Sequence, residues 1–232
     1  MKKYILCCAV ILFFTQPSFA HDMWLQESGE GFDILLGHQG QTEPYAPERV
    51  MKVLGYTQNG WPVPLDIKRE RDRCRVIPDE AFCALSGILD NQYWLKTTEG
   101  WKNQRERKGL EILQEGRSYK YTKHIVRWCG FLARPLKQRI EVVPLKDPTS
   151  MKEGDRLPVK IFFEGKPVQG ARLSKTSHMT NTHELEEVKG DGPFMVNIGP
   201  AGLQLINAKL MTLVKKKQVI WFASSLTFST TK

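Results

Sequence analysis

Hydrophobic and polar residues alternate in short runs over most of the 232-residue chain, which is the pattern of half-buried β-strands. The alternation is clearest where Phe222, Leu226 and Phe228 are separated by small or polar residues. Runs of the same kind, bounded by turn-forming residues, recur at 49–57, 61–67, 92–97 and 157–164. We therefore expect an all-β protein built from antiparallel strands.

The chain divides into three parts on this pattern. Residues 1–20 read as a leader, residues 21–143 as a β domain, and residues 144–232 as a second one, entered through the proline-containing stretch 144–149. The strand and turn spacing after residue 144 resembles an immunoglobulin-like sandwich. The expected architecture is two antiparallel β-sandwich-like domains after a cleaved signal peptide.

The leader has the features of a secretory signal peptide. Lys2 and Lys3 precede an apolar run at 4–14, and the small residues Ser18 and Ala20 stand where signal peptidase reads the chain. The run is shorter than the roughly 20 apolar residues that a membrane-spanning helix needs. We expect a periplasmic protein that does not span the membrane and whose mature form begins at His21.

A histidine at a free amino terminus offers a metal ion two nitrogens, its α-amine and its imidazole Nδ1. The α-amine has a pKa of about 8, so a metal displaces its proton easily at neutral pH. A turn-rich break at 27–31 separates His21 from a second apolar run that ends in His38. A hairpin centred on Gly29-Glu30 would set His21 opposite His38, within reach of one ion. These two histidines are the predicted metal ligands, although a slip of one residue would separate them.

Further donors are weighed against ordinary structural roles. His124 is either a third donor or, as we favour, a hydrogen-bonded histidine at a sheet edge. His178 and His183 are expected at a polar hairpin tip, and Met23 shares a strand face with His21 and would help Cu(I).

The cysteines that remain after the leader are Cys74, Cys83 and Cys129. In an oxidising compartment the short segment between Cys74 and Cys83 reads as a hairpin whose ends a disulfide could join. We expect that pair if any forms, with Cys129 as a buried apolar residue.

Charge and missing motifs exclude several functions. The formal net charge of +9 becomes +7 once Lys2 and Lys3 leave (9 − 2), but no aromatic-interleaved basic strip suggests nucleic-acid binding. The sequence contains no Gly-rich phosphate loop, no zinc-protease helix motif and no Gly-x-Ser-x-Gly elbow. We expect no enzyme of the hydrolase or nucleotide-dependent classes, and no nucleic-acid partner.

Several short motifs together resemble a family of bacterial envelope proteins, a domain of unknown function associated with the periplasmic component of cobalt and nickel uptake systems. They are HDMWL at 21–25, LGH at 36–38, EPY at 43–45, NQYW at 91–94, GWKN at 100–103, YKYTK at 119–123 and SLTF at 225–228. The resemblance covers nearly the whole mature chain and implies an all-β protein whose His21 and His38 match the family's histidines. Many relatives carry a further histidine where Ala208-Lys209-Leu210 stands here, so a ligand from that side is missing.

The expected function is therefore a periplasmic protein, not an enzyme, that captures Ni(II) or Co(II) with His21 and His38 and passes it to an envelope transporter. Three alternatives remain open. Copper suits the same nitrogen ligands, which allows a copper carrier or an oxidative enzyme with an amino-terminal histidine brace. The third is a metal-free envelope protein that binds a partner. For the oxidative enzyme, an exposed aromatic patch at Trp94 and Trp101 would be the supporting feature.

Overall fold

The protein is all-β, as the sequence predicts. A computed structural model describes residues 21–38, 41–79, 81–177 and 185–231, and of His38 it describes the backbone alone. Strands make up the secondary structure of these residues, apart from two short 3-10 segments, η2 (Pro47–Arg49) and η3 (Gly130–Ala133). Among the described residues no helix is long and apolar enough to cross a membrane.

The strands form three sheets. The first is built from strands that lie between residues 22 and 76. This amino-terminal sheet contains β1 (Asp22–Ser28), β2 (Gly31–His38), β3 (Gln41–Thr42), β6 (Lys68–Arg69) and β7 (Cys74–Val76). The predicted hairpin is confirmed, with Leu25 opposite Ile34 and Met23 opposite Leu36. β1 is the edge strand of this sheet.

The second sheet, the central sheet, has nine strands and joins both halves of the chain. In spatial order it contains β16 (Leu185–Glu187), β14 (Arg172–Ser174), β18 (Gly202–Lys215), β19 (Gln218–Thr230), β10 (Ile112–Ile125), β8 (Ala84–Thr97), β4 (Val50–Tyr56) and β5 (Pro62–Pro64), with β9 (Gly100–Lys102) paired to β8. β10 and β19 run parallel, whereas the other pairs in this sheet are antiparallel.

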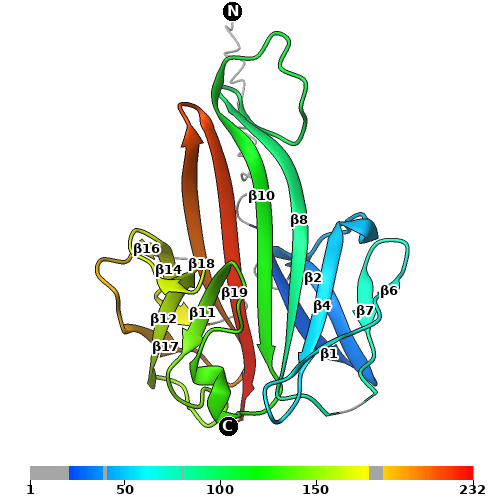
Figure 1. Cartoon of the computed structure of the whole chain (residues 1–232), viewed down its shortest axis with the longest axis vertical. Coiled ribbons are helices and arrows are strands. Elements are labelled where there is room, and N and C mark those ends of the chain that lie inside the picture. The colour runs from blue at the N-terminus through cyan, green and yellow to red at the C-terminus, as the bar shows by residue number, and fades with distance from the viewer. Residues whose placement is uncertain (1–20, 39–40, 80, 178–184, 232) are drawn as a thin grey trace, which may run out of the picture.

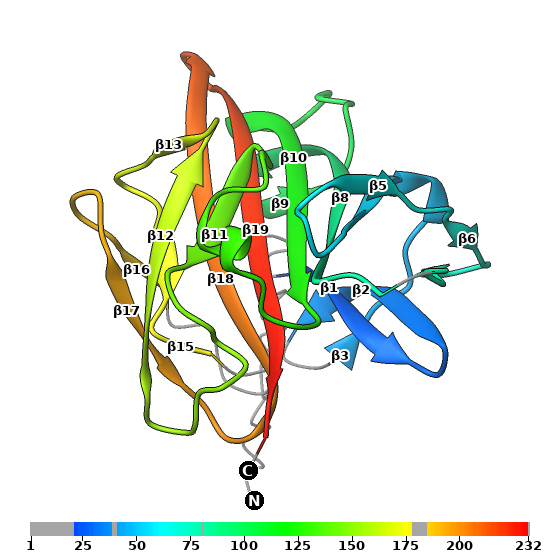
Figure 2. The same ribbon diagram turned by 60° about the horizontal axis from the view of Figure 1, so that its bottom comes forward.

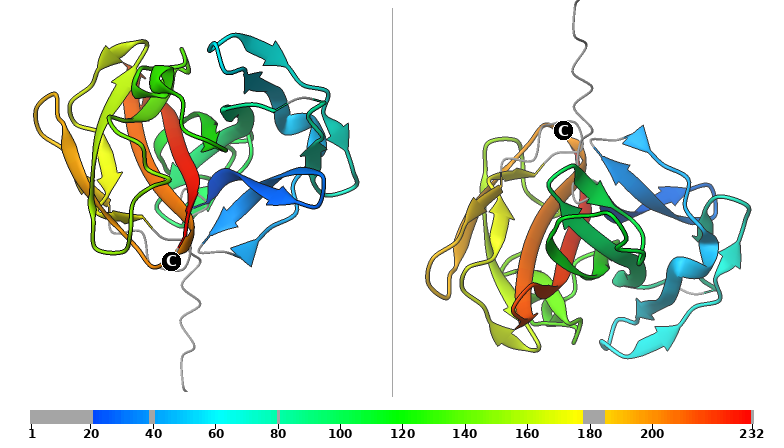
Figure 3. Two further views of the ribbon diagram at one scale, coloured as in Figure 1. Left: turned by 90° about the horizontal axis from the view of Figure 1, so that it is seen from below. Right: turned by 90° about the horizontal axis from the view of Figure 1, so that it is seen from above.

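The third sheet, the outer sheet, covers one face of the central sheet. It contains β11 (Ile140–Pro144), β12 (Arg156–Phe163), β13 (Lys166–Pro167), β15 (Thr176–Ser177) and β17 (Phe194–Ile198). The amino-terminal sheet lies across the opposite face, so the two expected sandwiches share their middle layer (Figures 1 and 2). Figure 3 shows the two outer layers on either side of the long central strands.

Each outer layer closes its own apolar core against the central sheet. Ile125, Phe222 and Phe228 meet Val142 and Ile161 of the outer sheet in the larger core. A second cluster joins Met23, Leu25 and Ile34 of the amino-terminal sheet to Leu85 and Leu89 of β8. The central sheet is therefore buried on both faces over the part of its length that the outer layers cover.

The prediction of a Cys74–Cys83 disulfide is wrong. Cys83 is bridged to Cys129, with a Cα–Cα distance of 6.0 Å, and Cys74 is a free, buried cysteine. Cys83 precedes β8 and Cys129 follows β10, and the antiparallel pairing of Ala84 with Ile125 brings the flanking residues together. Cys74 instead lies in β7, opposite Ile34 of the amino-terminal sheet.

The long central strands continue beyond both outer layers (Figure 1). A separate cluster of Trp94, Val219 and Trp221, with Trp101 packed against it, stabilises this extension. Trp101 meets Trp221 edge-on with 5.2 Å between ring centroids. This extension ends in the β18–β19 turn, which carries a run of three lysines at 215–217.

Candidate functional site

His21 and the first residues of β1 lie at the edge of the amino-terminal sheet, against the central sheet. The face of β10 and β19 below them is polar and buried, and includes Lys120, Thr122 and Ser225. Lys120 Nζ donates a hydrogen bond to the carbonyl oxygen of His21, and Ser225 Oγ donates one to that of Met23. Side chains thus satisfy two carbonyls that an edge strand would leave unpaired.

Asp22, between these two anchors, is held through its side chain. Its carboxylate is buried, and Lys209 Nζ of β18 lies 3.6 Å from Oδ1. Three consecutive residues, His21, Asp22 and Met23, are therefore each attached to a different strand of the central sheet, namely β10, β18 and β19. The backbone at the predicted new amino terminus is fixed rather than frayed.

His21 pairs with an acidic residue that the chain brings from beyond β2. Nε2 of His21 lies 2.9 Å from Glu43 Oε1, with the histidine side chain 19% exposed and the glutamate 51%. The imidazole is therefore partly buried, and the carboxylate is exposed. Both side chains are accessible from solvent.

The turn after β2 explains why Glu43 reaches His21. Gly37 pairs with Thr42, and the Glu43 amide donates to the Leu36 carbonyl at 2.8 Å. A Cβ at Gly37 would lie 1.9 Å from the Gln41 carbonyl oxygen, so only glycine permits this close return.

Tyr45 holds the segment that follows Glu43 against the amino-terminal sheet. Its hydroxyl donates to the Ile34 carbonyl at 2.6 Å and accepts from the Cys74 amide at 3.0 Å. Burial raises the pKa of Tyr45 far above its ordinary value, so the hydroxyl stays protonated and keeps both bonds. Glu43 is thus carried by a well-supported turn.

The strand register bears on the predicted pairing of His38 with His21. The β1–β2 ladder ends at Asp22 opposite Gly37. One further step in the same register would set His21 against His38. His38 ends β2 and pairs with Gln41. The side chain of His38 lies outside the described part of the chain.

Lys120 and Lys209 lie near His21 and Asp22, and Glu43 is bound to the His21 ring. Lys120 is fully buried, and this burial, with the charge of Lys209, lowers its pKa to about 7, against the opposing effect of Asp22. Lys209 belongs to the segment Ala208-Lys209-Leu210, in which the sequence departs from the resembled family. Its ammonium group faces Asp22.

The other sequence-based candidates lie elsewhere. His124 is 5% exposed, and its Nδ1 is 2.9 Å from Thr227 Oγ1 in the middle of the central sheet rather than at an edge. Burial lowers its pKa to about 4, which keeps it neutral. Met23 packs in the apolar core under β1, and His178 and His183 lie outside the described residues.

The described side chains alone do not form a complete metal cage. Within the described part of the chain, no group of three or more His, Cys, Asp or Glu is placed to hold an ion. Of the proposed donors, the imidazole of His21 is in place, with Glu43 bound to its Nε2. A second donor would be created by cleavage before His21, and a third would come from His38.

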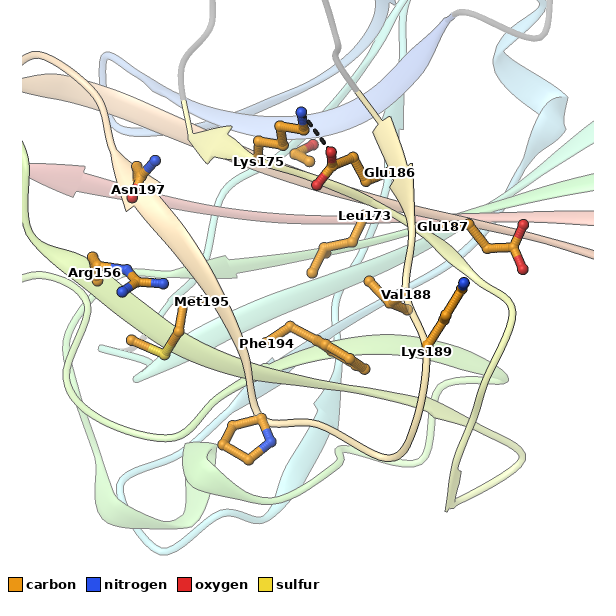
Figure 4. A pocket seen from close by; sticks show the side chains of 12 residues that line it. Arg156, Leu173, Lys175, Glu186, Glu187, Val188, Lys189, Phe194, Met195 and Asn197 are labelled. Atoms are coloured by element: carbon orange, nitrogen blue, oxygen red, sulfur yellow. Dashed lines mark ion pairs between the residues drawn. The ribbon is translucent and has the colours of Figure 1, made fainter.

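A separate cleft lies beside the outer sheet, and neither His21 nor Glu43 lines it. It has a volume of about 750 Å³ and lies between β14–β16 and β17, with an apolar base at Leu173 and Phe194. Figure 4 shows the ion pair between Lys175 and Glu186 at its rim, 2.5 Å between Nζ and Oε1. None of the described residues that line it is His or Cys.

Sequence reasoning missed the part that Glu43, Asp22 and Lys120 play around His21. Each lies inside one of the short motifs, in EPY, HDMWL and YKYTK, but spacing alone assigns these residues no common location. Glu43 reaches His21 through the close return at Gly37, and Lys120 reaches it through the packing of β1 on the central sheet, which no local pattern predicts. The exposed aromatic patch that would support an oxidative enzyme does not include Trp94, which is 9% exposed and belongs to a packed cluster.

Comparison with known proteins gives one match. The model of a family described as Domain of unknown function (DUF4198) matches residues 18–212. No curated protein and no solved structure matches the chain.

Proposed function

Since the chain belongs to the DUF4198 family, whose description names no activity, we propose a function from its site: the protein binds Ni(II) or Co(II) in the periplasm and assists its uptake. It acts as a carrier rather than an enzyme, and an envelope metal transporter receives the ion. The observation that carries this proposal is the three-point attachment of residues 21–23 to the central sheet. A terminal residue without a role would not need to be held this firmly.

The proposed ligands combine the new terminus with the neighbouring strand β2. Cleavage before His21 supplies an α-amine that chelates together with Nδ1 of the same residue, and His38 adds a second imidazole. Glu43, 2.9 Å from His21 Nε2, binds the ring nitrogen remote from Nδ1 and so holds the imidazole in place for the chelate. Amine and imidazole nitrogens suit Ni(II), Co(II) and Cu(II) better than Mg(II) or Ca(II).

Charge around the site allows a cation to bind. The carboxylates of Asp22 and Glu43 offset the ammonium groups of Lys120 and Lys209. All proposed ligands come from the amino-terminal sheet, and the central sheet contributes Lys209, an ammonium group that faces Asp22. Because the ligands come from one sheet and the site is partly open to solvent, a bound ion can be released again.

Metal titration of the mature protein tests the ligand set. Replacing His21 or His38 by Ala should weaken Ni(II) binding about 10- to 100-fold or more, and Glu43→Gln by about tenfold. Glu27→Gln, an exposed change at the far end of β1, is the matched control and should leave the affinity unchanged. Equal affinities for the wild type and the His21→Ala variant would refute the site.

Uptake into cells distinguishes nickel and cobalt carriage from copper carriage. Affinity alone favours Cu(II) at any nitrogen site, so in vitro preference does not identify the cargo. Cells that lack the protein should accumulate less nickel or cobalt at limiting supply, and wild type but not His21→Ala should restore it. A defect confined to copper would instead assign the protein to copper carriage.

A further inference from the structure

One end of the molecule combines exposed aliphatic side chains with a run of lysines. We call it the hairpin tip and define it as Leu113 of β10 together with residues 211–217 of the β18–β19 hairpin. Met211, Leu213 and Val214 are 50%, 68% and 59% exposed, and Leu113 is 42% exposed. Lys215, Lys216 and Lys217 follow directly and are exposed as well.

Contacts between the strand ends show that these residues form one surface. Gln114 Nε2 lies 3.7 Å from Met211 Sδ, and Lys217 Nζ donates to the Ile112 carbonyl at 2.8 Å. The Glu115 amide donates to the Lys217 carbonyl at 3.0 Å. Leu113 therefore lies beside the turn, at the end of the strands that extend past the outer layers (Figure 1).

The surface is basic as well as apolar. Residues 202–230, which include both strands and the turn, contain no Asp or Glu. The three lysines of the turn are thus not offset by acidic residues of their own hairpin. Burying such an aliphatic surface favours binding to any apolar phase, and the lysines select a partner with negative charge.

We propose that the hairpin tip docks the protein on a lipid bilayer that contains anionic phospholipid. The aliphatic side chains enter the boundary between headgroups and acyl chains, and the lysines pair with phosphate groups. Each lysine near an anionic membrane surface strengthens binding about fivefold, and the aliphatic residues add a contribution that salt does not weaken. The inference does not depend on the metal site.

The combination of charge and aliphatic surface favours an anionic bilayer as the partner. Leu213 and Val214 lie at the irregularity where the β18–β19 register shifts, directly before the three lysines of the turn. An anionic bilayer offers phosphate groups to the lysines and an acyl layer to the exposed aliphatic side chains at the same time.

Docking in this way would hold the proposed metal site at a fixed distance from the membrane surface. Lys120, which binds His21, and Leu113 are seven residues apart on the same strand, or about 23 Å at 3.3 Å per residue. The amino terminus would then stand within reach of a protein embedded in the same membrane.

Vesicle co-sedimentation tests the proposal directly. The full-length mature protein is mixed with vesicles of phosphatidylcholine alone or with one-fifth phosphatidylglycerol. We expect binding to the anionic vesicles, a loss of about tenfold or more for Leu213→Ser/Val214→Ser, and about 100-fold for Lys215→Gln/Lys216→Gln/Lys217→Gln. Val126→Ser removes an aliphatic residue of similar exposure, 44%, just past the opposite end of β10, and should leave binding unchanged.

Two results would overturn the proposal. One is equal binding of wild type and the Leu213→Ser/Val214→Ser variant to anionic vesicles. The other is self-association in light scattering that this variant abolishes, without vesicle binding by the wild type, which would make the tip a contact between two copies. Circular dichroism of each variant checks that the β-structure is intact.

Discussion

Lys209 Nζ lies 3.6 Å from Asp22 Oδ1, where β18 of the central sheet meets the first strand of the mature chain. Asp22 is 2% exposed, so its charge depends on this partner and on the neighbouring Lys120. Lys209→Met should lower the free energy of unfolding by about 2–3 kcal/mol because it leaves a buried carboxylate with less compensation. Urea unfolding measures the change.

A matched double variant separates the ion pair from simple packing. Asp22→Asn/Lys209→Met removes both charges and should recover part of the stability lost in Lys209→Met. If the double variant is no more stable than the single one, the contact does not hold β1 on the central sheet.

A second buried ion pair joins the central sheet to the outer sheet. Lys123 Nζ lies 2.7 Å from Glu141 Oε1, and the two side chains are 1% and 0% exposed. Lys123→Met should cost about 3–5 kcal/mol in chemical denaturation, since Glu141 would keep a buried charge. Arg139→Gln, which removes an exposed pair with Glu164, is the control and should cost less than about 1 kcal/mol. Comparable losses in both variants would contradict this assignment.

The disulfide joins the start of β8 to the segment after β10. Cys83 and Cys129 are 46 residues apart, and a loop of that length corresponds to about 4 kcal/mol of stabilisation in the chain-entropy model. We expect Cys83→Ala/Cys129→Ala to lose roughly this amount in thermal or urea unfolding. Thiol titration of the native wild type should detect no reactive group, because Cys74 is buried, and should detect one after unfolding.

Acid should destabilise the protein through His124. Burial lowers the pKa of His124 to about 4, against an ordinary value of about 6.5. Between these pH values the unfolded chain binds a proton that the folded chain does not, so stability present above pH 6.5 is lost as the pH falls toward 4. The loss from this residue is about 3 kcal/mol in total. His124→Gln should flatten this part of the curve of unfolding free energy against pH, and an unchanged slope would exclude His124 as the cause.

Local patterns were sufficient to predict most strands but not the way in which the sheets combine. The turn at Gly29-Glu30 and the alternation on both sides of it were sufficient to predict the β1–β2 register, from Ser28 opposite Gly31 to Asp22 opposite Gly37. The pairing of β10 with β19 joins residues about 100 positions apart, and no local signal encodes it. For the same reason the Cys83–Cys129 bridge was missed, since it depends on the neighbouring β8 and β10 ends rather than on sequence spacing.

The site was predictable in part for the same physical reason. His21 and His38 belong to one hairpin, so strand register alone relates them. Glu43 required the close return at Gly37, and Lys120 and Lys209 required the long-range order of the central sheet. The anchoring of the terminus, on which the proposed function rests, therefore became visible only in three dimensions.

The central claim is that the α-amine and imidazole of a mature His21 together hold a metal ion. The most direct test is a Ni(II) competition titration on two forms of the protein, one beginning at His21 and one with four residues added before it. Four are needed because an amine one or two residues before a histidine can form a chelate of its own. The account predicts that the extended form binds Ni(II) more weakly by about tenfold or more, and equal affinity of the two forms would contradict it.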